Sequence, residues 1–390
     1  MDFTPLERET WAELKQGTAS AFTAPEKPLL LFFGMRDRTD GVDPLNPSGL
    51  RRAGFSGARN MRVNGINIRV PSQYNMPKAT DSPFVFDGKR IMDRISGDSW
   101  KVELPGVDLK GAGIDCALPT LSGAVGIMVF PGCANFDIGK SCEFCIAGGT
   151  AGKTPITPLE AVAALQKIRD FGLPVTSVSL NTGQMPRGDE MSYILSCAEA
   201  IKKWDADVKI STEVWPYSVP SDLQPLKGKI DCFQVNIELT SDAARKVLCP
   251  AKPDAEAYFG VFERLAKAGF EVTSVLQTNF YIEKEPLEDV ARAIRRMLSI
   301  GVIPEFLVSR AVTGANVADR FFGRKTTLRE NISRYAEWLG RLTALTSEFG
   351  QEIAERSGKL CASCVKCGMC SLNAGMKGAG REDELFKNQP

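Results

Sequence analysis

Three cysteines near the middle of the sequence have a spacing that suits metal binding. Eight residues separate Cys133 from Cys142, and two separate Cys142 from Cys145. Three thiolates from one loop can bind three irons of a cubane 4Fe–4S cluster and leave the fourth iron without a protein ligand. A substrate or a cofactor can then coordinate that iron. The alternative is a structural zinc or iron site that a distant cysteine completes.

A second group of cysteines lies near the C-terminus, with two residues between neighbours: Cys361, Cys364, Cys367 and Cys370. Ferredoxin-type runs use three such cysteines for one cluster, while the fourth ligates elsewhere. We therefore predict an auxiliary iron–sulfur cluster, and a zinc ribbon is the alternative. Cys249, which precedes a proline, is a candidate remote ligand. A buried structural thiol is the other interpretation of Cys249.

The composition excludes several kinds of function. None of the 390 residues is histidine, so Ser-His-Asp and Cys-His catalysis and zinc sites with imidazole ligands are excluded. Proton transfer must involve Lys, Glu, Asp, Tyr, Cys or the substrate. A net charge of +1 gives no electrostatic reason to expect a nucleic acid or a membrane as partner. Because the sequence shows neither a signal-peptide core nor a long apolar run, we expect a cytoplasmic location.

An alternation of strand and helix patterns positions the first cysteine group. Helix patterns are clearest at 158–172, 191–203, 254–269 and 286–299, and the first of them begins with Thr157 as cap and Pro158 in the first turn. This alternation predicts a parallel sheet with right-handed crossovers, either doubly wound or closed toward a barrel. The glycine motifs of nucleotide-binding doubly wound folds are missing. The predicted strands are 124–130, 175–180, 208–214, 232–239, 271–281 and 305–309.

The regions that flank this alternation differ from it. Before residue 116, the Asn64-Gly65 and Asp87-Gly88 steps join short β-prone runs and predict hairpins. After residue 309, apolar residues at helix spacing predict a helix over 327–349. We therefore divide the chain into a β-rich N-terminal region (1–115), a central α/β unit (116–315) and a helical extension that carries the second cysteine group (316–390).

Polar residues in the predicted strands are the remaining candidates for a site. Ser211 and Glu213 lie in one strand, and Asn236 and Glu238 in the next. Polar side chains inside parallel strands are costly unless they are satisfied, which indicates a ligand-lined interior. Solvent-facing strand ends are the alternative. Arg310, after the last strand, could pair with a carboxylate or form a peripheral salt bridge.

The first cysteine group resembles the motif of the radical S-adenosylmethionine (radical SAM) family. That family reads Cys-x3-Cys-x2-Cys with an aromatic residue before the third cysteine, and Phe144 stands there in Cys-Glu-Phe-Cys. The first gap departs from the family, with eight residues instead of three. The resemblance covers residues 124–310 and implies a partial (β/α)6 barrel of the TIM type, with the cluster at the carboxyl ends of its strands.

The resemblance also implies the cofactors and the residues that bind them. The cofactors would be a SAM-binding 4Fe–4S cluster, an auxiliary 4Fe–4S cluster and S-adenosylmethionine. Thr182, Gly183 and Gln184 stand where the family has a Gly-Gly-Glu-like element that binds the amino group of the methionine portion of SAM. Here an amide replaces the carboxylate. Strand-end residues such as Ser211, Glu213, Asn236, Glu238 and Arg310 would hold the ribose and carboxylate of SAM, or the substrate.

The function expected from the resemblance is generation of a 5′-deoxyadenosyl radical that abstracts hydrogen from an unactivated C–H bond. Because the C-terminal group is compact, we favour sulfur insertion by a divergent lipoyl- or biotin-synthase-like enzyme. Electron transfer and substrate anchoring by the auxiliary cluster are the alternatives, and a two-cluster electron carrier is the non-enzyme alternative. The expected partners are SAM, an organic or carrier-bound substrate, and an electron donor such as ferredoxin or flavodoxin, with a partner enzyme as a further option.

Overall fold

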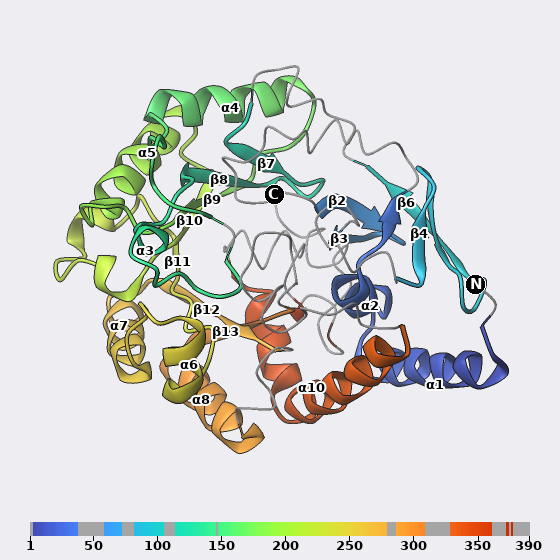
Figure 1. Cartoon of the computed structure of the whole chain (residues 1–390). Helices are drawn as coiled ribbons and strands as arrows, with labels where there is room; N and C mark the ends of the chain where they lie inside the picture. Colours follow the sequence, from blue (N-terminus) through green and yellow to red (C-terminus); the bar gives the residue numbers. More distant parts are fainter. Residues whose placement is uncertain are drawn as a thin grey trace.

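The middle of the chain forms a curved seven-stranded sheet (Figure 1). The computed structural model describes residues 3–37, 58–71, 82–104, 114–145, 147–278, 286–308, 328–360, 372–373 and 376. Across this sheet the order is β13-β12-β11-β10-β9-β8-β7. Neighbours from β8 to β13 pair in parallel, and β7 is antiparallel to β8. The strands are β7 (Ala117–Pro119), β8 (Ala124–Phe130), β9 (Ser177–Thr182), β10 (Lys209–Glu213), β11 (Cys232–Gln234), β12 (Glu271–Gln277) and β13 (Val302–Leu307).

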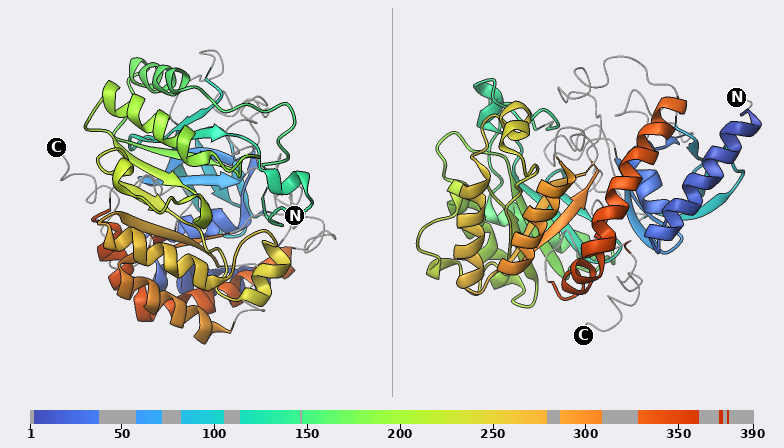
Figure 2. Two further views of the ribbon diagram at one scale, coloured as in Figure 1. Left: turned by 90° about the vertical axis from the view of Figure 1, so that its left-hand side faces the viewer. Right: turned by 90° about the horizontal axis from the view of Figure 1, so that it is seen from below.

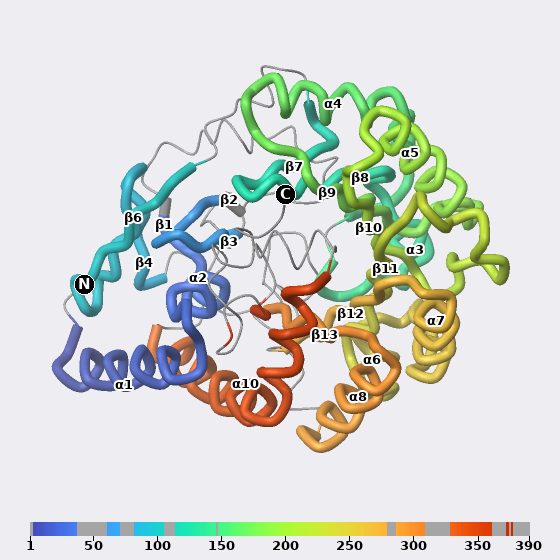
Figure 3. Tube along the Cα trace, turned by 180° about the vertical axis from the view of Figure 1, so that it is seen from behind, coloured from blue at the N-terminus to red at the C-terminus, as the bar shows by residue number. Residues whose placement is uncertain are grey.

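The six parallel strands follow one another in chain order, without a reversal. A doubly wound sheet reverses its strand order at a switch point, whereas a barrel keeps it. The connecting helices lie along the convex side of the sheet in both Figure 1 and Figure 3. The sheet is therefore a partial barrel, which curves but whose described edge strands, β13 and β7, do not pair with each other. The prediction of an α/β protein with a mostly parallel sheet is confirmed. The helices are α4 (Pro158–Asp170), α5 (Glu190–Trp204), α6 (Asp242–Leu248), α7 (Ala255–Lys267) and α8 (Leu287–Ile300).

Local sequence signals account for where these helices begin and end. At α4, the Thr157 and Glu160 side chains form a reciprocal capping box, as the Thr157-Pro158 pattern predicts. The Asp254 side chain caps α7 by accepting from the Ala257 N–H, and α8 ends at Gly301 in the left-handed conformation. Between β10 and β11 the connection contains two 3₁₀ turns, η3 (Pro216–Ser218) and η4 (Gln224–Leu226).

One predicted strand is much shorter than expected. The pattern predicts a strand over 232–239, but β11 ends at Gln234. Asn236 then uses its side-chain oxygen to accept from the Val275 N–H at 3.1 Å, and Glu238 adopts a φ of +62°. The prediction of regular strand through Leu239 is therefore wrong, because side-chain atoms of Asn236 and Ser274 replace backbone partners there and Glu238 rejoins β12 only as an isolated bridge to Leu276.

The N-terminal region forms a second, mostly antiparallel sheet with the order β1-β4-β5-β6-β2-β3. Both predicted hairpins are present. Asn64 and Gly65 have φ values of 48° and 87°, the left-handed pair that a tight two-residue turn requires. Two helices precede and flank this sheet. The elements are α1 (Pro5–Ala21), α2 (Glu26–Phe33), β1 (Arg36–Asp37), β2 (Ala58–Val63), β3 (Ile66–Pro71), β4 (Phe84–Phe86), β5 (Arg90–Asp93) and β6 (Ser99–Glu103).

A long helix, α10 (Leu328–Ser357), joins the two sheets. It lies between α1 and the last strands of the barrel, as the right-hand view of Figure 2 shows. Tyr335 of α10 shares a 2.9 Å hydrogen bond with Thr18 of α1, while the Trp338 indole donates to Thr278 after β12 at 3.1 Å. Buried apolar side chains from both sheets and from α10 form one continuous cluster. None of the described helices combines the length and apolar character that a bilayer span requires.

The chain after the second cysteine group returns to the edge of the barrel. The Leu372 N–H donates to the Phe306 carbonyl of β13 at 2.9 Å. The Asn373 side chain continues this pairing, since it accepts from the Phe306 N–H at 3.1 Å and donates to the Pro304 carbonyl at 2.8 Å. The free edge of β13 is thereby covered near its carboxyl end. The four C-terminal cysteines and Arg310 lie outside the described residues.

Candidate functional site

The first cysteine group lies in a loop that leaves the carboxyl end of β8. Cys133 is the N-cap of a one-turn helix, α3 (Ala134–Asp137), so the long gap after Cys133 begins as a helix. The Cys133 N–H donates to the Gly148 carbonyl at 3.0 Å, and the Lys153 ammonium donates to the Ala147 carbonyl at 2.6 Å. Asp137 accepts from the backbone N–H and the hydroxyl of Thr150. These bonds close the loop on itself.

The loop is also fastened to the end of β9. The Ala134 N–H donates to the Gln184 carbonyl at 2.8 Å, and the Gly183 N–H donates to the Phe130 carbonyl at 3.4 Å. Gly183 packs so closely that a Cβ atom there would lie 2.0 Å from the Gly132 carbonyl oxygen. The Thr182-Gly183-Gln184 turn therefore supports the cysteine loop directly.

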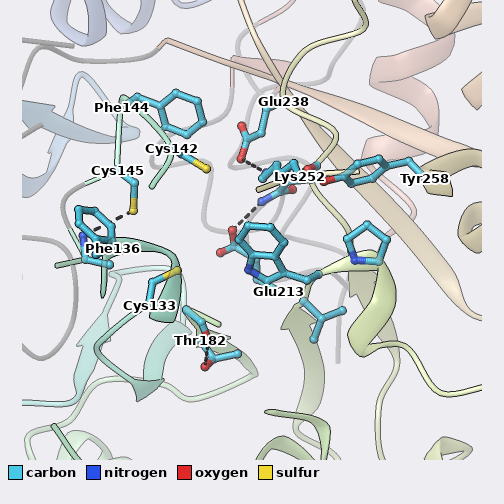
Figure 4. Close-up of a pocket in the computed structure, with 16 residues that line it drawn as sticks. Cys133, Phe136, Cys142, Phe144, Cys145, Thr182, Glu213, Glu238, Lys252 and Tyr258 are labelled. Carbon is cyan, nitrogen blue, oxygen red and sulfur yellow. Dashed lines mark hydrogen bonds and ion pairs between the residues drawn. The ribbon is translucent and has the colours of Figure 1, made fainter. Parts of the chain in front are cut away.

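All three cysteines line one cavity of about 190 Å³, together with residues from the carboxyl ends of three consecutive strands. Thr182 and Gly183 come from the end of β9, Glu213 ends β10, and Asn236 and Glu238 follow β11. In Figure 4 the cysteines lie on one side, and Glu213, Glu238 and Lys252 face them. The remaining lining residues are Phe136, Phe144, Ala147, Val214, Trp215, Pro216, Lys252 and Tyr258.

The wall opposite the cysteines carries a buried ion pair. The Lys252 ammonium lies 3.1 Å from Glu238 Oε1, and each side chain is less than a tenth exposed. The other Glu238 oxygen accepts from the Gln277 amide at 2.6 Å, and Lys252 also donates to the Asn236 carbonyl at 2.9 Å. Burial alone would lower the pKa of Lys252, but the charge of Glu238 outweighs it and raises that pKa. Lys252 is therefore charged at neutral pH.

Glu238 is held by an unusual backbone. Its φ of +62° is in the left-handed region, and the Leu239 N–H donates to the Ile237 carbonyl across it at 2.7 Å. A side chain larger than Asn or Asp seldom adopts this conformation, which costs about 1–3 kcal/mol. Strain of this kind persists where the surrounding structure fixes the residue. Here it turns the carboxylate toward Lys252 instead of along the strand.

Tyr258 contributes a buried hydroxyl to the same wall. The residue lies in the first turns of α7, is fully buried, and lines the cavity. Its hydroxyl has no hydrogen-bond partner in the described part of the structure. A buried hydroxyl normally has one, so this donor is available to a ligand. Trp215 adds an apolar ring, with the Lys252 ammonium 5.6 Å from its centre.

Burial controls the protonation of the cysteine thiols. It raises the pKa of Cys145 to about 12, and it also raises that of Cys133, although backbone N–H groups of Asn135 and Gln184 oppose the change there. The pKa of Cys142 is raised first by a hydrogen bond with the Cys249 thiol and then by burial. Free thiolates are therefore disfavoured in this loop, and a bound cation would have to displace the protons.

The donor set fits an iron–sulfur cluster better than a single ion. Three thiols with no imidazole are soft ligands of the kind that Fe–S clusters and zinc select. Among the residues that the structure describes, no three Cys, Asp or Glu side chains converge closely enough to hold one metal ion. In a cubane each thiolate binds a different iron, so its ligands stand apart around a shared space, as the three cysteines do here (Figure 4).

Glu213 is the group whose protonation changes near neutral pH. Burial raises its pKa to about 7, with a further increase from the charge of Glu238, although Lys252 and a 2.6 Å hydrogen bond from the Asn236 amide lower it. Glu213 lines the cavity and through it keeps partial contact with solvent. In a chain without histidine, Glu213 is thus suited to donate or accept a proton.

We expect Glu213→Gln to stabilise the ligand-free protein more as the pH rises. The folded-state pKa of about 7 exceeds the ordinary value of 4.5, so the folded protein favours the protonated carboxyl group. The stability that this group contributes below pH 4.5 is therefore lost as the pH rises from 4.5 to about 7. Relative to wild type, the variant should gain about 2 kcal/mol in free energy of unfolding between pH 5 and pH 8. This value is smaller than the full pKa shift would give, because the side chain is partly exposed and solvent screens its charge. Urea unfolding at several pH values measures this.

Glu256→Gln is the matched control. A hydrogen bond from Arg296 lowers the pKa of this surface carboxyl, so its replacement should become less favourable, not more, as the pH rises from the acid range. An equal stability difference between Glu213→Gln and wild type at every pH would contradict the assignment of Glu213.

The structure brings most of the predicted site residues together. Of the ten predicted ligands of the first cluster and of SAM that it describes, eight line the cavity. Gln184 and Ser211 do not: Gln184 acts through its backbone beside Cys133, and Ser211 is buried in β10, two residues before Glu213. Cys249, the candidate remote ligand of the auxiliary cluster, does not line it either. The eight are Cys133, Cys142, Cys145, Thr182, Gly183, Glu213, Asn236 and Glu238, and Phe144 of the motif lines the cavity with them.

Sequence reasoning missed Lys252, Tyr258, Trp215 and Phe136, which also line the cavity. Tyr258 was hidden because it follows the helical spacing of an ordinary amphipathic helix. Phe136 lies in the long gap between the first two cysteines. For Lys252 a signal existed. The sequence Pro-Ala-Lys-Pro directly follows Cys249, and its two prolines restrict the loop that holds the lysine.

No protein-family model matches the chain, and no curated protein sequence matches it. Several solved structures are similar at low identity, each matched over less than two thirds of its own length. Methylornithine synthase (PylB) is 13% identical over 56% of this chain and 62% of that one, with a TM-score of 0.39. SuiB from Streptococcus suis, bound to the precursor peptide SuiA, is 12% identical over 61% and 49%, with a TM-score of 0.41. Coproporphyrinogen III oxidase (HemN) from Escherichia coli, a radical SAM enzyme, is 16% identical over 56% and 52%, with a TM-score of 0.37.

Proposed function

We propose that the protein is a radical SAM enzyme, with a 4Fe–4S cluster held by Cys133, Cys142 and Cys145 and S-adenosylmethionine bound beside it. The observation that carries this proposal is the shared cavity. Three thiols from the loop after β8 face polar groups from the ends of β9, β10 and β11. The carboxyl ends of parallel barrel strands are where such folds place their reactive groups.

When bound, such a cluster supplies the electron that cleaves SAM into methionine and a 5′-deoxyadenosyl radical, which abstracts hydrogen from a C–H bond of the substrate. The residues of this chain supply the surroundings. Phe136, Phe144 and Trp215 line the cavity with apolar rings that exclude water. The closed loop around Cys133 and the contact with Gly183 keep the three thiols in place before any ligand binds.

Charge in the cavity suits a cationic ligand such as SAM, which carries a sulfonium and an ammonium group. Glu238 is neutralised by Lys252, whereas Glu213 accepts only from the Asn236 amide among the hydrogen bonds described here. Since Gln184 lies outside the cavity lining, we propose that Glu213 supplies the carboxylate that the family carries at the Gln184 position. Thr182 and Gly183 would contribute backbone groups, and Tyr258 a hydroxyl donor. For Arg310 and Ser211, ligand binding remains a prediction.

A spectroscopic experiment tests the proposal without a known substrate. Anaerobically reconstituted protein should show the visible charge-transfer absorption of an iron–sulfur cluster. After reduction with dithionite, the electron paramagnetic resonance signal of the cluster should change when SAM is added. Loss of this SAM-dependent change in Glu213→Gln, with the cluster retained, would support the ligand role of Glu213. A reduced cluster whose signal is identical with and without saturating SAM would contradict binding at an open iron.

We further propose that the C-terminal cysteines hold an auxiliary cluster that donates sulfur to the substrate radical. The support is the spacing of Cys361, Cys364, Cys367 and Cys370, together with the pairing of Leu372 and Asn373 to β13, which brings the chain near the carboxyl edge of the barrel after this segment. Electron transfer by that cluster, with an external donor such as ferredoxin or flavodoxin, is the alternative that retains the sulfide.

Iron analysis separates these parts of the proposal. Replacing Cys133, Cys142 and Cys145 together by alanine should leave about four irons per chain, whereas also replacing the C-terminal four should leave none. Once a substrate is known, the sulfide content of the protein should fall during a single turnover by one sulfide for each sulfur atom inserted into the product. An auxiliary cluster that stays intact through repeated turnovers would rule out sulfur donation and favour electron transfer.

A further inference from the structure

A fourth cysteine lies directly behind the cysteine loop. Cys249 directly follows α6 as its C-cap residue and is fully buried. It belongs to a small apolar cluster with Leu239, Ala244 and Leu248, against which Cys142 and Phe144 pack. Cys142 lines the cavity and Cys249 does not. Cys249 therefore lies beside Cys142 without lining the cavity.

Hydrogen bonds fix the two cysteines relative to each other. The backbone N–H of Glu143, next to Cys142, donates to the carbonyl of Leu248, next to Cys249, at 2.9 Å. Cys142 itself packs against the apolar cluster that contains Cys249. Lys252 is tied to the same turn, since its N–H donates to the Cys249 carbonyl at 2.8 Å. The segments that carry Cys142 and Cys249 are therefore joined by a backbone hydrogen bond as well as by side-chain packing.

Cys249 does not share the cavity that the three proposed ligands line. It belongs instead to the buried apolar cluster against which Cys142 packs. A thiol that is not bound to metal is a weak donor, and a metal-bound thiolate is an acceptor. When Cys142 ligates iron, the proton of Cys249 therefore has one charged acceptor beside it.

We propose that the Cys249 thiol donates a hydrogen bond to the Cys142 thiolate and thereby raises the reduction potential of the cluster. Hydrogen bonds to ligating sulfurs and the burial of the site are the means by which proteins tune such potentials. The bond draws electron density from the sulfur and stabilises the extra negative charge of the reduced cluster. Cys249 is thus a positioning residue, not a ligand. This inference rests on the proposed cluster at Cys133, Cys142 and Cys145.

Reduction potentials of three variants test the inference. In Cys249→Ala the cluster should still form with wild-type iron content, but its equilibrium constant for reduction should fall about tenfold, which is about 59 mV for a one-electron couple. Cys249→Ser, whose hydroxyl can donate to the same thiolate, should recover most of the shift. Cys197→Ala is the control, because Cys197 is an equally buried free cysteine on α5 that does not line the cavity.

The outcomes separate this inference from the proposed function. Equal potentials for wild type and Cys249→Ala, both with full iron content, would overturn the hydrogen bond while leaving the cluster in place. Loss of the first cluster in Cys249→Ala, with the fold retained, would also overturn it, because Cys249 would then be a ligand. Failure of wild type to assemble the cluster at all would instead refute the proposed function, and that result is read from wild type alone.

Discussion

Gly183→Ala is expected to destroy the cysteine site and to destabilise the protein by about 3 kcal/mol or more. A Cβ atom at this position would lie 2.0 Å from the carbonyl oxygen of Gly132 and 2.9 Å from Cβ of Cys133. Cys133 is held by the hydrogen bond of its N–H to Gly148, and the Gly132 carbonyl is part of the same backbone, so neither can move away as the end of a flexible side chain could. The turn after β9 or the cysteine loop must be displaced.

Urea unfolding and iron content measure the two consequences of Gly183→Ala. The free energy of unfolding should fall, and reconstituted protein should retain less iron than wild type. Gly260→Ala is the matched control, since Gly260 lies within α7 with open space around its Cβ position. There the same substitution should stabilise the helix by about 0.5–1 kcal/mol. Wild-type stability and iron content in Gly183→Ala would contradict the described contact between β9 and the cysteine loop.

Lys252→Met is expected to destabilise the protein by about 3–5 kcal/mol, because it leaves the Glu238 carboxylate buried with only a neutral partner. The pair is less than a tenth exposed on either side, and Gln277 is the remaining donor to Glu238 among the hydrogen bonds described here. The double variant Lys252→Met/Glu238→Gln removes both charges and should recover most of this loss.

A more exposed ion pair, whose Asp231 carboxylate also lies 3.2 Å from Lys202, gives the reference for a surface charge. Lys209 and Asp231 lie 3.3 Å apart, almost the same separation, but the Lys209 side chain is 44% exposed. Lys209→Met should therefore cost less than about 1 kcal/mol. Urea unfolding of all four proteins at pH 7 gives the values. A loss for Lys252→Met no greater than that for Lys209→Met would contradict an ionised, buried Lys252–Glu238 pair.

The sequence was sufficient to predict the existence of the six parallel strands, though not all of their bounds, for physical reasons that are visible in the structure. Strands buried on both faces read as short continuous apolar runs, and β8 is such a run from Ala124 to Phe130. The helices between them begin at strong caps such as Thr157 and end at glycines such as Gly301. Those signals are local, so they survive in the sequence without knowledge of the fold.

The wall opposite the cysteines could be predicted only in part. The sequence indicated Glu213, Asn236 and Glu238, but tertiary contacts bring Lys252 and Tyr258 to face the same cavity. Glu238 faces Lys252 through a turn with positive φ, and no residue in Val-Asn-Ile-Glu-Leu indicates that turn. The sequence favoured a buried structural thiol at Cys249 over a remote ligand, and only the pairing of Glu143 with Leu248 places it beside Cys142. The division of the chain into three regions, and binding by the C-terminal cysteines, remain predictions.

Cleavage of S-adenosylmethionine is the measurement that tests the central claim most directly. Anaerobically reconstituted protein is reduced with dithionite and incubated with SAM, and 5′-deoxyadenosine and methionine are quantified by liquid chromatography. We predict both products in wild type and in Cys197→Ala, and neither above background in Cys142→Ala. Absence of 5′-deoxyadenosine from wild type that carries a reducible cluster, or equal amounts from wild type and Cys142→Ala, would contradict the proposed radical SAM chemistry.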